Sequence, residues 1–266
     1  MAELDDSALA RDFAALIGAD HVREPQGRES AVANLVLEPA HAEEIGAIVR
    51  KCERDQIPLA PIGATRTFLW SEPRPIAISL ARMNRVVAYE PHDMTIVAEA
   101  GVTLGDLNRI AAERGQRLPV DPPHAAITTI GSLIAGARAG PIRLSEGTVR
   151  DLLIGIRFVG HNGCLIHAGG RVVKNVAGYD LMKVLTGSFG TLGIIVEAAF
   201  KVRPIPPNYT LAVASFASIA EAFAAAHQAD QAAHLFHCEM LGGSIATAFV
   251  ESGEFALLAG FGGIRA

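Results

Sequence analysis

Glycine, proline and hydroxyl-bearing residues gather in the stretch 118–143, which reads LPVDPPHAAITTIGSLIAGARAGPIR. The prolines stiffen the chain, and the later residues carry small side chains, hydroxyl groups and backbone N–H groups that no large side chain shields. These later positions are Thr128, Thr129, Gly131, Ser132, Gly136 and Gly140. They suit close contact with a phosphate and a planar ring. They would equally let two helices pack closely, and the stretch alone leaves both interpretations open.

A second candidate site is the segment 61–70, PIGATRTFLW, which follows a short predicted strand. Loops at the carboxyl ends of strands receive ligands in open α/β sheets. Gly63, Thr65 and Thr67 can donate hydrogen bonds, and Arg66 can pair with a phosphate oxygen. The alternative is an ordinary surface loop with one solvated arginine.

The spacing of apolar residues predicts the elements of the first half of the chain. Helices are expected at 8–18, 41–54 and 103–115, and strands at 31–37, 57–61, 76–80, 85–90 and 95–99. The succession of strand, helix and strand between 31 and 61 predicts parallel pairing with a right-handed crossover. Thr103 followed by Asp106 is a capping pair, and Gly115 ends that helix.

In the second half, Asn162-Gly163 between two apolar runs predicts a hairpin closed by a type I′ turn, which needs positive φ at both positions. The expected elements are strands at 152–159, 164–168, 194–202, 210–216, 246–251 and 255–261, a strand starting near 169, helices at 179–185 and 218–229, and a glycine-rich turn at 187–193. Pro204, Pro206 and Pro207 predict a linker before the last part of the chain.

Composition narrows the class of protein. The 266 residues are half hydrophobic and 19% charged, which is typical of one large or two modest globular domains. A net charge of -5 gives no electrostatic footprint for nucleic acid or an anionic membrane. The N-terminus lacks the pattern of a secretory signal, and no apolar run reaches the roughly 20 residues that span a bilayer. We therefore expect a soluble, cytoplasmic protein.

Several catalytic and metal motifs are missing from the sequence. It contains no GxxxxGK[ST], GxSxG or HExxH, and a predicted helix precedes Gly187, Gly190 and Gly193, the reverse of a dinucleotide fingerprint. The cysteines at 52, 164 and 238 form no CxxC pair and are expected to be buried, reduced thiols. His234, His237 and Cys238 lack a fourth ligand, so no metal site is predicted.

Lys174, Asn175, Tyr179 and Asp180 form a dense polar group near the glycine-rich turn. They would either face a cofactor or substrate, or serve the local backbone. The second interpretation is favoured because the chain must turn twice here, with Asn175 and Asp180 capping turns and Tyr179 anchoring a short helix.

Three segments together resemble the flavin-binding domain of the vanillyl-alcohol oxidase family, also called the PCMH-type FAD-binding fold. They are PIGATRTFLW, DPPHAAITTIGSLIAGARAGPIR and GGRVVKNVAGYDLMKVLTGSFGTLGIIVEAAFKVRP. The third is similar to the flavin-binding subunit of bacterial glycolate oxidase. The resemblance implies an α+β protein with a two-subdomain FAD-binding fold followed by a partial α+β cap domain. The implied division is an N-terminal helical extension at 1–28, the FAD-binding domain at 29–205 with subdomains at about 29–82 and 83–205, and the cap at 208–266.

The resemblance also implies a cofactor and its binding residues. FAD would be bound non-covalently, because the first loop contains no histidine. The residues carried over by position are Ile62, Gly63, Ala64, Thr65, Arg66 and Thr67 in the first loop, Pro122, Thr128, Thr129, Gly131, Ser132, Ala135 and Gly140 in the second, and Gly193 with Ile194 in the third. A branched side chain at Gly131 is expected to abolish FAD binding with the fold largely intact.

The activity implied by the resemblance is two-electron oxidation of a 2-hydroxy acid, glycolate to glyoxylate, with electrons passed through FAD to a partner. The expected partners are a catalytic flavoprotein subunit and an iron–sulfur subunit, which would attach the chain peripherally to a membrane. Two alternatives stay open: a flavin-free structural subunit of such a complex, and a stand-alone D-lactate or 2-hydroxyglutarate dehydrogenase. The first is suggested by the single glycine of the first loop, whereas the second would need a longer cap with substrate ligands.

Overall fold

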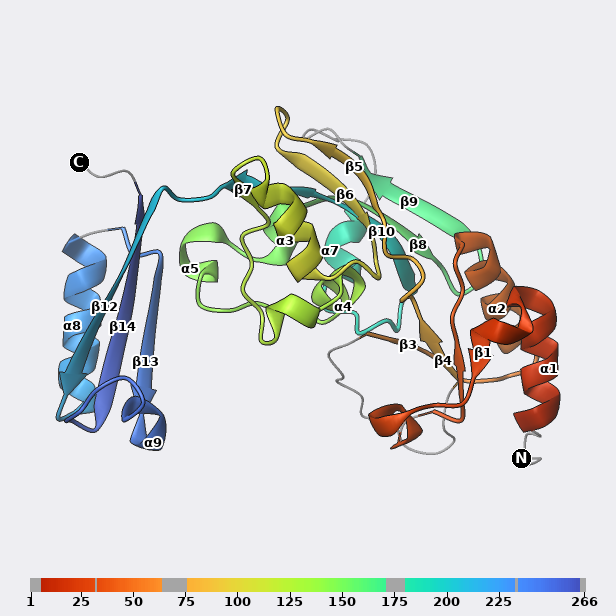
Figure 1. The fold of residues 1–266 in the computed structure, drawn as a ribbon, viewed down its shortest axis with the longest axis horizontal. Helices are drawn as coiled ribbons and strands as arrows, with labels where there is room; N and C mark the ends of the chain where they lie inside the picture. The colour runs from red at the N-terminus through yellow and green to blue at the C-terminus, as the bar shows by residue number, and fades with distance from the viewer. Residues whose placement is uncertain (1–5, 32, 64–75, 171–179, 233, 264–266) are drawn as a thin grey trace.

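The computed structural model describes residues 6–31, 33–63, 76–170, 180–232 and 234–263. Helices and sheets are mixed along the chain, as expected of an α+β protein. Two sheets lie close together in the middle and at one end of the molecule, and a third lies at the opposite end (Figure 1).

The first sheet is formed near the N-terminus in the order β1-β2-β4-β3. Its strands are β1 (Val22–Arg23), β2 (Leu35–Leu37), β3 (Leu59–Ile62) and β4 (Ile76–Ser79), with α1 (Asp6–Ile17), α2 (Ala42–Arg54) and the 3-10 turns η1 (Ala19–His21) and η2 (Gly27–Ala31) around them. β2, β4 and β3 run parallel, but β4 lies between the two strands that α2 connects. The strand predicted from residue 31 starts only at Leu35: Ala31 ends η2, and Ala33 and Asn34 lie outside any helix or strand.

The second sheet is antiparallel, with the order β5-β6-β10-β8-β9. Its strands are β5 (Val86–Glu90), β6 (Thr95–Glu99), β8 (Leu153–Val159), β9 (Leu165–Gly169) and β10 (Ile194–Lys201). Short helices fill the connections: α3 (Leu104–Ala112), η3 (Ala125–Ile127), α4 (Ile130–Ala135), α5 (Arg143–Glu146), α6 (Val149–Leu152) and α7 (Leu181–Leu185). The strand expected near 169 falls largely on 171–179, outside the described residues.

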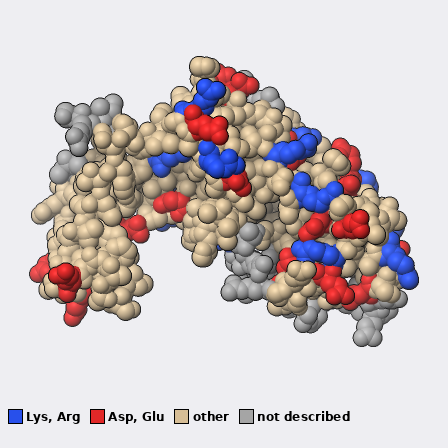
Figure 2. Space-filling view, in the orientation of Figure 1, with Lys and Arg blue, Asp and Glu red and all other residues tan. Residues whose placement is uncertain are grey.

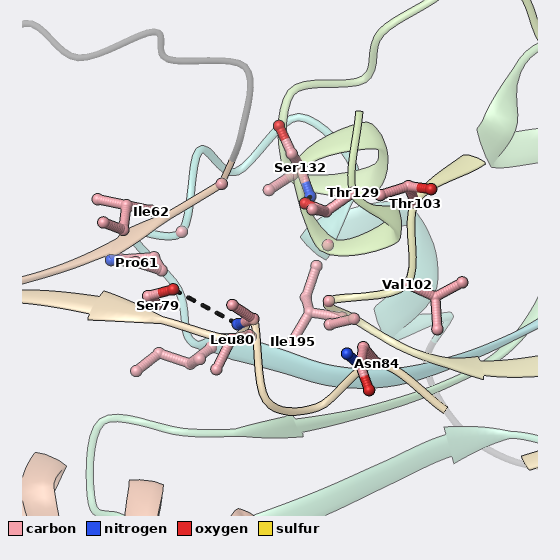
Figure 3. A pocket seen from close by; sticks show the side chains of 18 of the residues that line it. Pro61, Ile62, Ser79, Leu80, Asn84, Val102, Thr103, Thr129, Ser132 and Ile195 are labelled. Atoms are coloured by element: carbon pink, nitrogen blue, oxygen red, sulfur yellow. Dashed lines mark hydrogen bonds between the residues drawn. The ribbon is translucent and has the colours of Figure 1, made fainter. Parts of the chain in front are cut away.

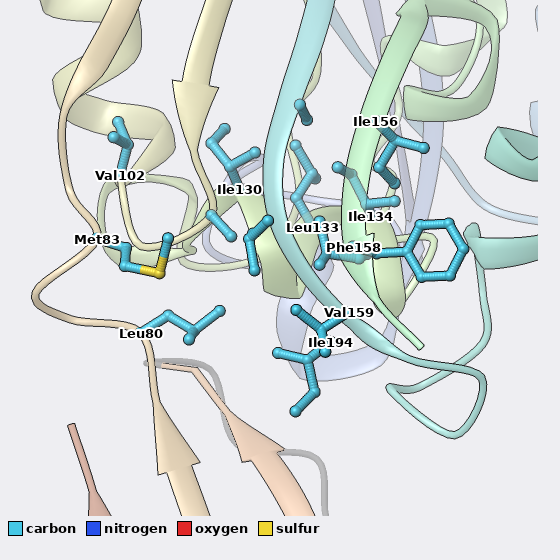
Figure 4. Packing of buried hydrophobic residues seen from close by; sticks show 14 of the residues in the cluster. Leu80, Met83, Val102, Ile130, Leu133, Ile134, Ile156, Phe158, Val159 and Ile194 are labelled. Atoms are coloured by element: carbon cyan, nitrogen blue, oxygen red, sulfur yellow. The ribbon is translucent and has the colours of Figure 1, made fainter. Parts of the chain in front are cut away.

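One continuous hydrophobic core joins the first two sheets. It includes Phe13 of α1, Ile48 of α2, Ile78 of β4 and Phe200 of β10. Figure 4 shows Leu80 and Met83, from the chain that leaves β4, among the apolar side chains of α4 and of the second sheet. The two sheets are therefore held to each other by burial of apolar surface.

The hairpin between β8 and β9 confirms the Asn162-Gly163 prediction but corrects its turn type. Gly163 has a φ of 71°, whereas Asn162 is not among the described residues with positive φ. The N–H of Gly163 bonds the carbonyl of Gly160, and the N–H of Gly160 bonds the carbonyl of Cys164. This is the longer loop that ends on one left-handed glycine, not a two-residue type I′ turn.

The last part of the chain forms a third sheet, β12-β14-β13, in which both outer strands are antiparallel to β14. Its elements are β12 (Asn208–Phe216), α8 (Ile219–Ala232), β13 (His237–Gly242), α9 (Gly243–Ala246) and β14 (Phe255–Gly263). The strand predicted at 246–251 is wrong: the backbone there continues from α9 into turns, with Val250 N–H bonded to the Ala246 carbonyl. The strand that pairs with β14 is β13, which carries His237 and Cys238.

The third sheet contacts the rest of the molecule through a few polar and aromatic groups. Ser145 Oγ donates to the carbonyl of Phe236 at 2.8 Å, and the Arg117 guanidinium lies 5.0 Å from the centre of the Phe236 ring. Within the proline segment, Pro204 is not merely a linker residue, because β11 (Arg203–Pro204) pairs with β7 (Gln116–Arg117). This short ladder fixes the point where the chain leaves the second sheet.

Surface charge and cysteine placement bear on the expected class of protein. In Figure 2 acidic and basic side chains are interspersed over the first two sheets, whereas only acidic ones are seen over the third sheet. The three cysteines are unpaired. Cys52 is buried, and burial raises the pKa of its thiol to about 12, but Cys164 is exposed, contrary to expectation.

Within the described residues, no helix is both long enough and apolar enough to cross a membrane.

Gly101 provides a test of how the two sheets are joined. A Cβ added there would lie 2.0 Å from the Leu80 carbonyl oxygen and 2.7 Å from that of Met83, and backbone atoms cannot swing away. We expect Gly101→Ala to lower the free energy of unfolding by about 1–3 kcal/mol in chemical denaturation without FAD. As control, Gly115→Asn has open space and a left-handed backbone that Asn tolerates, so its change should stay within about 0.5 kcal/mol. Equal stability of both variants would show that the close packing of Gly101 against the Leu80 and Met83 carbonyls does not stabilise the fold.

Candidate functional site

A cavity of about 630 Å³ lies between the first two sheets. The first sheet contributes Pro61, Ile62 and Gly63 from the end of β3 and Ser79 with Leu80 from the end of β4. The residues after β6, the helix α4, the loop before β10 and the start of β10 form the other walls. In Figure 3 the ends of β3 and β4 face Thr129 and Ser132 of α4 across this space. Its size is ordinary for a cofactor site.

The start of α4 is fixed by hydrogen bonds to the chain that follows β6. Ile130 N–H donates to the Val102 carbonyl and Gly131 N–H to the Ala100 carbonyl, both at 2.8 Å. Thr129 caps the helix, its Oγ1 accepting from Ser132 N–H at 3.3 Å. These N–H groups are therefore committed to the protein, not free for a phosphate.

This arrangement changes the role expected of Gly131. A Cβ at Gly131 would lie 3.1 Å from Ala100 Cβ and 3.3 Å from its carbonyl oxygen, so the glycine allows α4 to approach the second sheet. Close packing, the alternative for the stretch 118–143, occurs at this position, but against the chain after β6 and not against a second helix; Gly131 also lines the cavity. A branched residue there would strain the fold, and loss of FAD binding in such a variant would not report the site alone.

Gly63 lies where β3 meets α4. A Cβ on Gly63 would lie 3.0 Å from both Ser132 Cβ and Thr129 Oγ1, which is tighter than ordinary contact. The single glycine of the first loop therefore stands at a close approach between the first sheet and α4. The two elements meet here as opposite walls of the cavity.

The loop 187–193 closes the cavity on a third side. Gly187 N–H donates to the Ile134 carbonyl at 3.0 Å, and Phe189 N–H donates to the Ala135 carbonyl at 2.8 Å. A Cβ on Gly190 would lie 2.3 Å from Pro61 Cγ, so the loop also presses against β3. The expected order of helix, glycine-rich turn and strand is confirmed by α7 and β10 on either side.

Polar groups are sparse on the cavity wall and positioned by the local backbone. Ser79 Oγ accepts weakly from Ala81 N–H at 3.4 Å, shown dashed in Figure 3, and Asn84 extends its amide at the cavity edge. Thr103 caps α3, accepting from Asp106 N–H at 3.0 Å and donating to its carboxylate. The bond that the Thr103 hydroxyl donates, and then the one from Arg109, lower the pKa of the Asp106 carboxyl.

The described cavity wall carries as many basic as acidic residues. The basic residues are Arg23, Arg109 and Arg138, and the acidic residues are Glu29, Glu38 and Asp106. Arg23 pairs with Glu29 and Glu38 at 2.8 Å each, and these bonds raise its pKa. The described wall thus offers mainly neutral hydroxyl and amide donors beside an apolar floor.

The cavity brings together more than half of the residues expected to bind the cofactor. Those that line it are Ile62, Gly63, Thr129, Gly131, Ser132, Ala135, Gly193 and Ile194. Ala64, Thr65, Arg66 and Thr67 lie outside the described residues, so their placement stays a prediction. Pro122, Thr128 and Gly140 are not on the cavity wall.

The off-cavity residues have contacts of their own. Thr128 is fully buried, and its hydroxyl donates to the His124 carbonyl at 3.1 Å. A Cβ on Gly140 would lie 2.0 Å from the Asp121 carbonyl oxygen, so this glycine permits two chain segments to meet. Asp121 also accepts from Ile142 N–H at 3.2 Å, while burial raises the pKa of its carboxyl. These residues shape the loop that leads into α4.

Several cavity residues were not anticipated: Ser79, Leu80, Asn84, Val102, Thr103, Phe189 and Ile195. Ser79 stands near the carboxyl end of the strand predicted at 76–80, which the structure pairs in parallel with β2 and β3. Thr103 was read only as a helix cap. Phe189 was not predicted as a site residue, because it lies among the glycines of its loop.

The remaining polar candidates serve local structure. Asp180 caps α7, accepting from Lys183 N–H at 3.3 Å, as expected, whereas Lys174, Asn175 and Tyr179 lie outside the described residues. The ring of His237 bonds the Tyr209 hydroxyl across the third sheet. Among the residues that the structure describes, no group of three or more His, Cys, Asp or Glu is placed to hold a metal ion.

Comparison with known families identifies the domain. The family model described as an FAD binding domain matches residues 33–169, just over half of the chain and most of the cavity wall. The chain belongs to this FAD-binding family. FAD is the cofactor of the family, and its site is expected in the cavity whose wall the matched segment mostly forms.

Curated relatives share the domain at moderate identity. The chain is 35% identical over 160 residues to glycolate oxidase subunit GlcE of Escherichia coli, covering 59% of this chain and 46% of that protein. It is 33% identical over 188 residues to subunit GlcD of Bacillus subtilis, and the match covers 69% of this chain and 40% of that protein. It is 31% identical over 194 residues to the mitochondrial D-lactate dehydrogenase [cytochrome] of Arabidopsis thaliana, and this match covers 72% of this chain and 34% of that protein. The matched segments thus span less than half the length of these relatives.

Solved structures confirm the fold. Alkyldihydroxyacetonephosphate synthase superposes with a TM-score of 0.77 at 20% identity, covering 97% of this chain and 56% of that one. Substrate-bound p-cresol methylhydroxylase gives the same TM-score at 18% identity, with 99% and 62% covered. The chain therefore has the PCMH-type FAD-binding fold that its sequence resembles.

The described residues fit FAD. An apolar floor that includes Ile62, Leu80, Val102 and Ile195 suits a planar ring, and the hydroxyl groups of α4 lie opposite the strand ends. Gly63 lines the same cavity, and the absence of a side chain there allows β3 to approach α4 closely. Neutral donors and shaped apolar walls are the usual means of orienting such a ligand.

Ser132 allows the site to be tested with less disturbance than Gly131. We expect Ser132→Leu, which puts a larger apolar side chain on the cavity wall, to weaken FAD binding about tenfold or more, a loss of roughly 1.4 kcal/mol. Ser132→Ala removes only the hydroxyl and should cost a few-fold at most, about 1 kcal/mol. The measurement is equilibrium FAD titration, with thermal unfolding to check the fold. Wild-type affinity in a folded Ser132→Leu variant would place the cofactor elsewhere.

Proposed function

We propose that the chain is the FAD-binding subunit of a complex that oxidises a 2-hydroxy acid, with glycolate as the first candidate and glyoxylate as its product. The single observation that carries this proposal is the cavity between the first two sheets, most of whose wall comes from the matched FAD-binding segment. The proposed division is the N-terminal helical extension at 1–28, FAD-binding subdomains at about 29–82 and 83–205, and a partial cap at 208–266. Within it, β1 also adds a strand to the first sheet.

The relatives support the substrate class through a shared chemical group. Their names mention glycolate, D-lactate and D-2-hydroxyglutarate. Each of these acids has a hydroxyl on the carbon next to a carboxylate, so one oxidation chemistry serves all three. Glycolate is preferred here because the subunit-type relative GlcE matches at 35% identity.

Bound FAD would supply the acceptor for a hydride from the hydroxyl-bearing carbon. The residues of this chain would hold and shield it. Ile62, Leu80 and Ile195 exclude water from one part of the cavity, and Thr129 with Ser132 present hydroxyls to its polar part. We include Ile62, Gly63, Thr129, Ser132, Ala135, Gly193 and Ile194 in the proposed binding wall, together with the first-loop residues 64–67.

The proton of the substrate hydroxyl must go to a base. The described cavity wall contains no histidine, and its three acids are held in hydrogen bonds to arginine or to Thr103. We therefore propose that a partner supplies the base and the substrate contacts. A catalytic flavoprotein subunit would do this, and an iron–sulfur subunit would accept the electrons and link the complex to a membrane surface.

The experiment compares the purified chain alone with the chain co-expressed with its partner subunits. We expect both preparations to be yellow and to release FAD on heating or acidification. Under anaerobic conditions glycolate should bleach the flavin of the complex and leave that of the isolated chain unchanged. D-Lactate and D-2-hydroxyglutarate are the matched comparison substrates.

Other outcomes would replace the proposal. A colourless chain that joins the complex and takes up no FAD would be a flavin-free structural subunit. An isolated chain whose flavin is reduced by D-lactate or D-2-hydroxyglutarate would be a stand-alone dehydrogenase.

A further inference from the structure

Phe189 has an unusual backbone for its residue type. Its φ is 52°, in the left-handed region that strongly disfavours residues with a Cβ, and a bulky residue there is an outlier. The other left-handed positions of the same loop are Gly187 at 82°, Gly190 at 79° and Gly193 at 156°. The loop thus uses glycine wherever the backbone demands it, except where it carries a phenyl ring.

The contacts around Phe189 hold this conformation in place. Its N–H donates to the Ala135 carbonyl of α4 at 2.8 Å. On the following residue, a Cβ at Gly190 would lie 2.3 Å from Pro61 Cγ, so β3 presses on the loop from the other side. The backbone of Phe189 is therefore set between two walls of the cavity.

Burial of apolar surface does not explain why a phenyl side chain occupies this position. Phe189 lines the cavity and is 59% exposed, so more than half of its surface stays in water in the FAD-free protein. A strained position that is kept by its surroundings and stays largely exposed points to a ligand contact. A planar ligand in the cavity would cover the phenyl group and gain an aromatic contact.

We propose that Phe189 packs its ring against an aromatic ring of FAD. This inference rests on the proposed FAD binding and adds a positioning residue outside the expected set. FAD carries two such rings, adenine and isoalloxazine. Both offer the same stacking chemistry, and FAD fragments that contain one ring each distinguish them.

The test measures equilibrium binding of FAD, FMN and ADP to the wild-type chain and to Phe189→Ala, Phe189→Leu and Phe189→Tyr. Removing the aromatic contact should weaken FAD binding about tenfold in Phe189→Ala. Phe189→Tyr keeps the ring and should stay within about twofold of wild type, and Phe189→Leu, which restores bulk without a ring, should remain weakened. A loss of ADP binding assigns the contact to adenine, and a loss of FMN binding assigns it to isoalloxazine.

Phe189→Gly tests the backbone argument separately. Without FAD, this variant should melt about 2–4 °C above Phe189→Ala, because glycine accepts the left-handed conformation. Equal melting temperatures would contradict the strain on which the inference depends. The readout is thermal unfolding and involves no activity.

The inference is overturned if Phe189→Ala binds FAD as tightly as the wild type, or if Phe189→Leu restores full affinity. In that case wild-type FAD binding, and the proposed function with it, still stands. A wild-type chain that binds no FAD contradicts the proposed cofactor site itself, which separates the two failures.

Discussion

The site depends on close contact between backbones where the two sheets meet. The chain after β6 receives hydrogen bonds from the start of α4 at Ala100 and Val102, and Gly101 packs against the carbonyls of Leu80 and Met83. These contacts leave no space for side chains, which explains why small residues gather at this point. Because the first sheet, the second sheet and α4 are fixed to one another here, the cavity between them is largely formed before any ligand enters.

The two sheets contribute differently to the cavity. The parallel strands β3 and β4 present their carboxyl ends, where the chain turns away and exposes polar backbone and short side chains. The antiparallel sheet supplies apolar side chains at the start of β10 and anchors α4. A planar cofactor with a charged linker matches such a combination. The third sheet stands apart from this cavity and meets the rest of the chain through Ser145, Phe236 and Arg117.

The pattern of apolar residues and the turn residues predicted most elements. In α2 the buried residues recur at helical spacing, and in β10 all but two of the residues are buried, as its apolar sequence indicates. The prediction failed where local pattern and tertiary pairing diverge: the apolar run 246–251 starts in α9, and β13, which includes His237 and Glu239, pairs with β14. Composition located the loops of the site but not their contacts. Gly131 and Gly140 looked like ligand-binding glycines, yet the space beside each is filled by other protein atoms. Phe189 was missed because its left-handed φ can be recognised only in three dimensions.

Hydrogen–deuterium exchange with and without FAD tests most directly whether the cavity between the sheets is the cofactor site. The account predicts that FAD slows exchange most in the segments that form the cavity wall, 61–63, 79–84, 100–103, 129–136 and 189–195. The strands of the third sheet should change little. Protection concentrated in 208–263, with the cavity segments unaffected, would contradict the account.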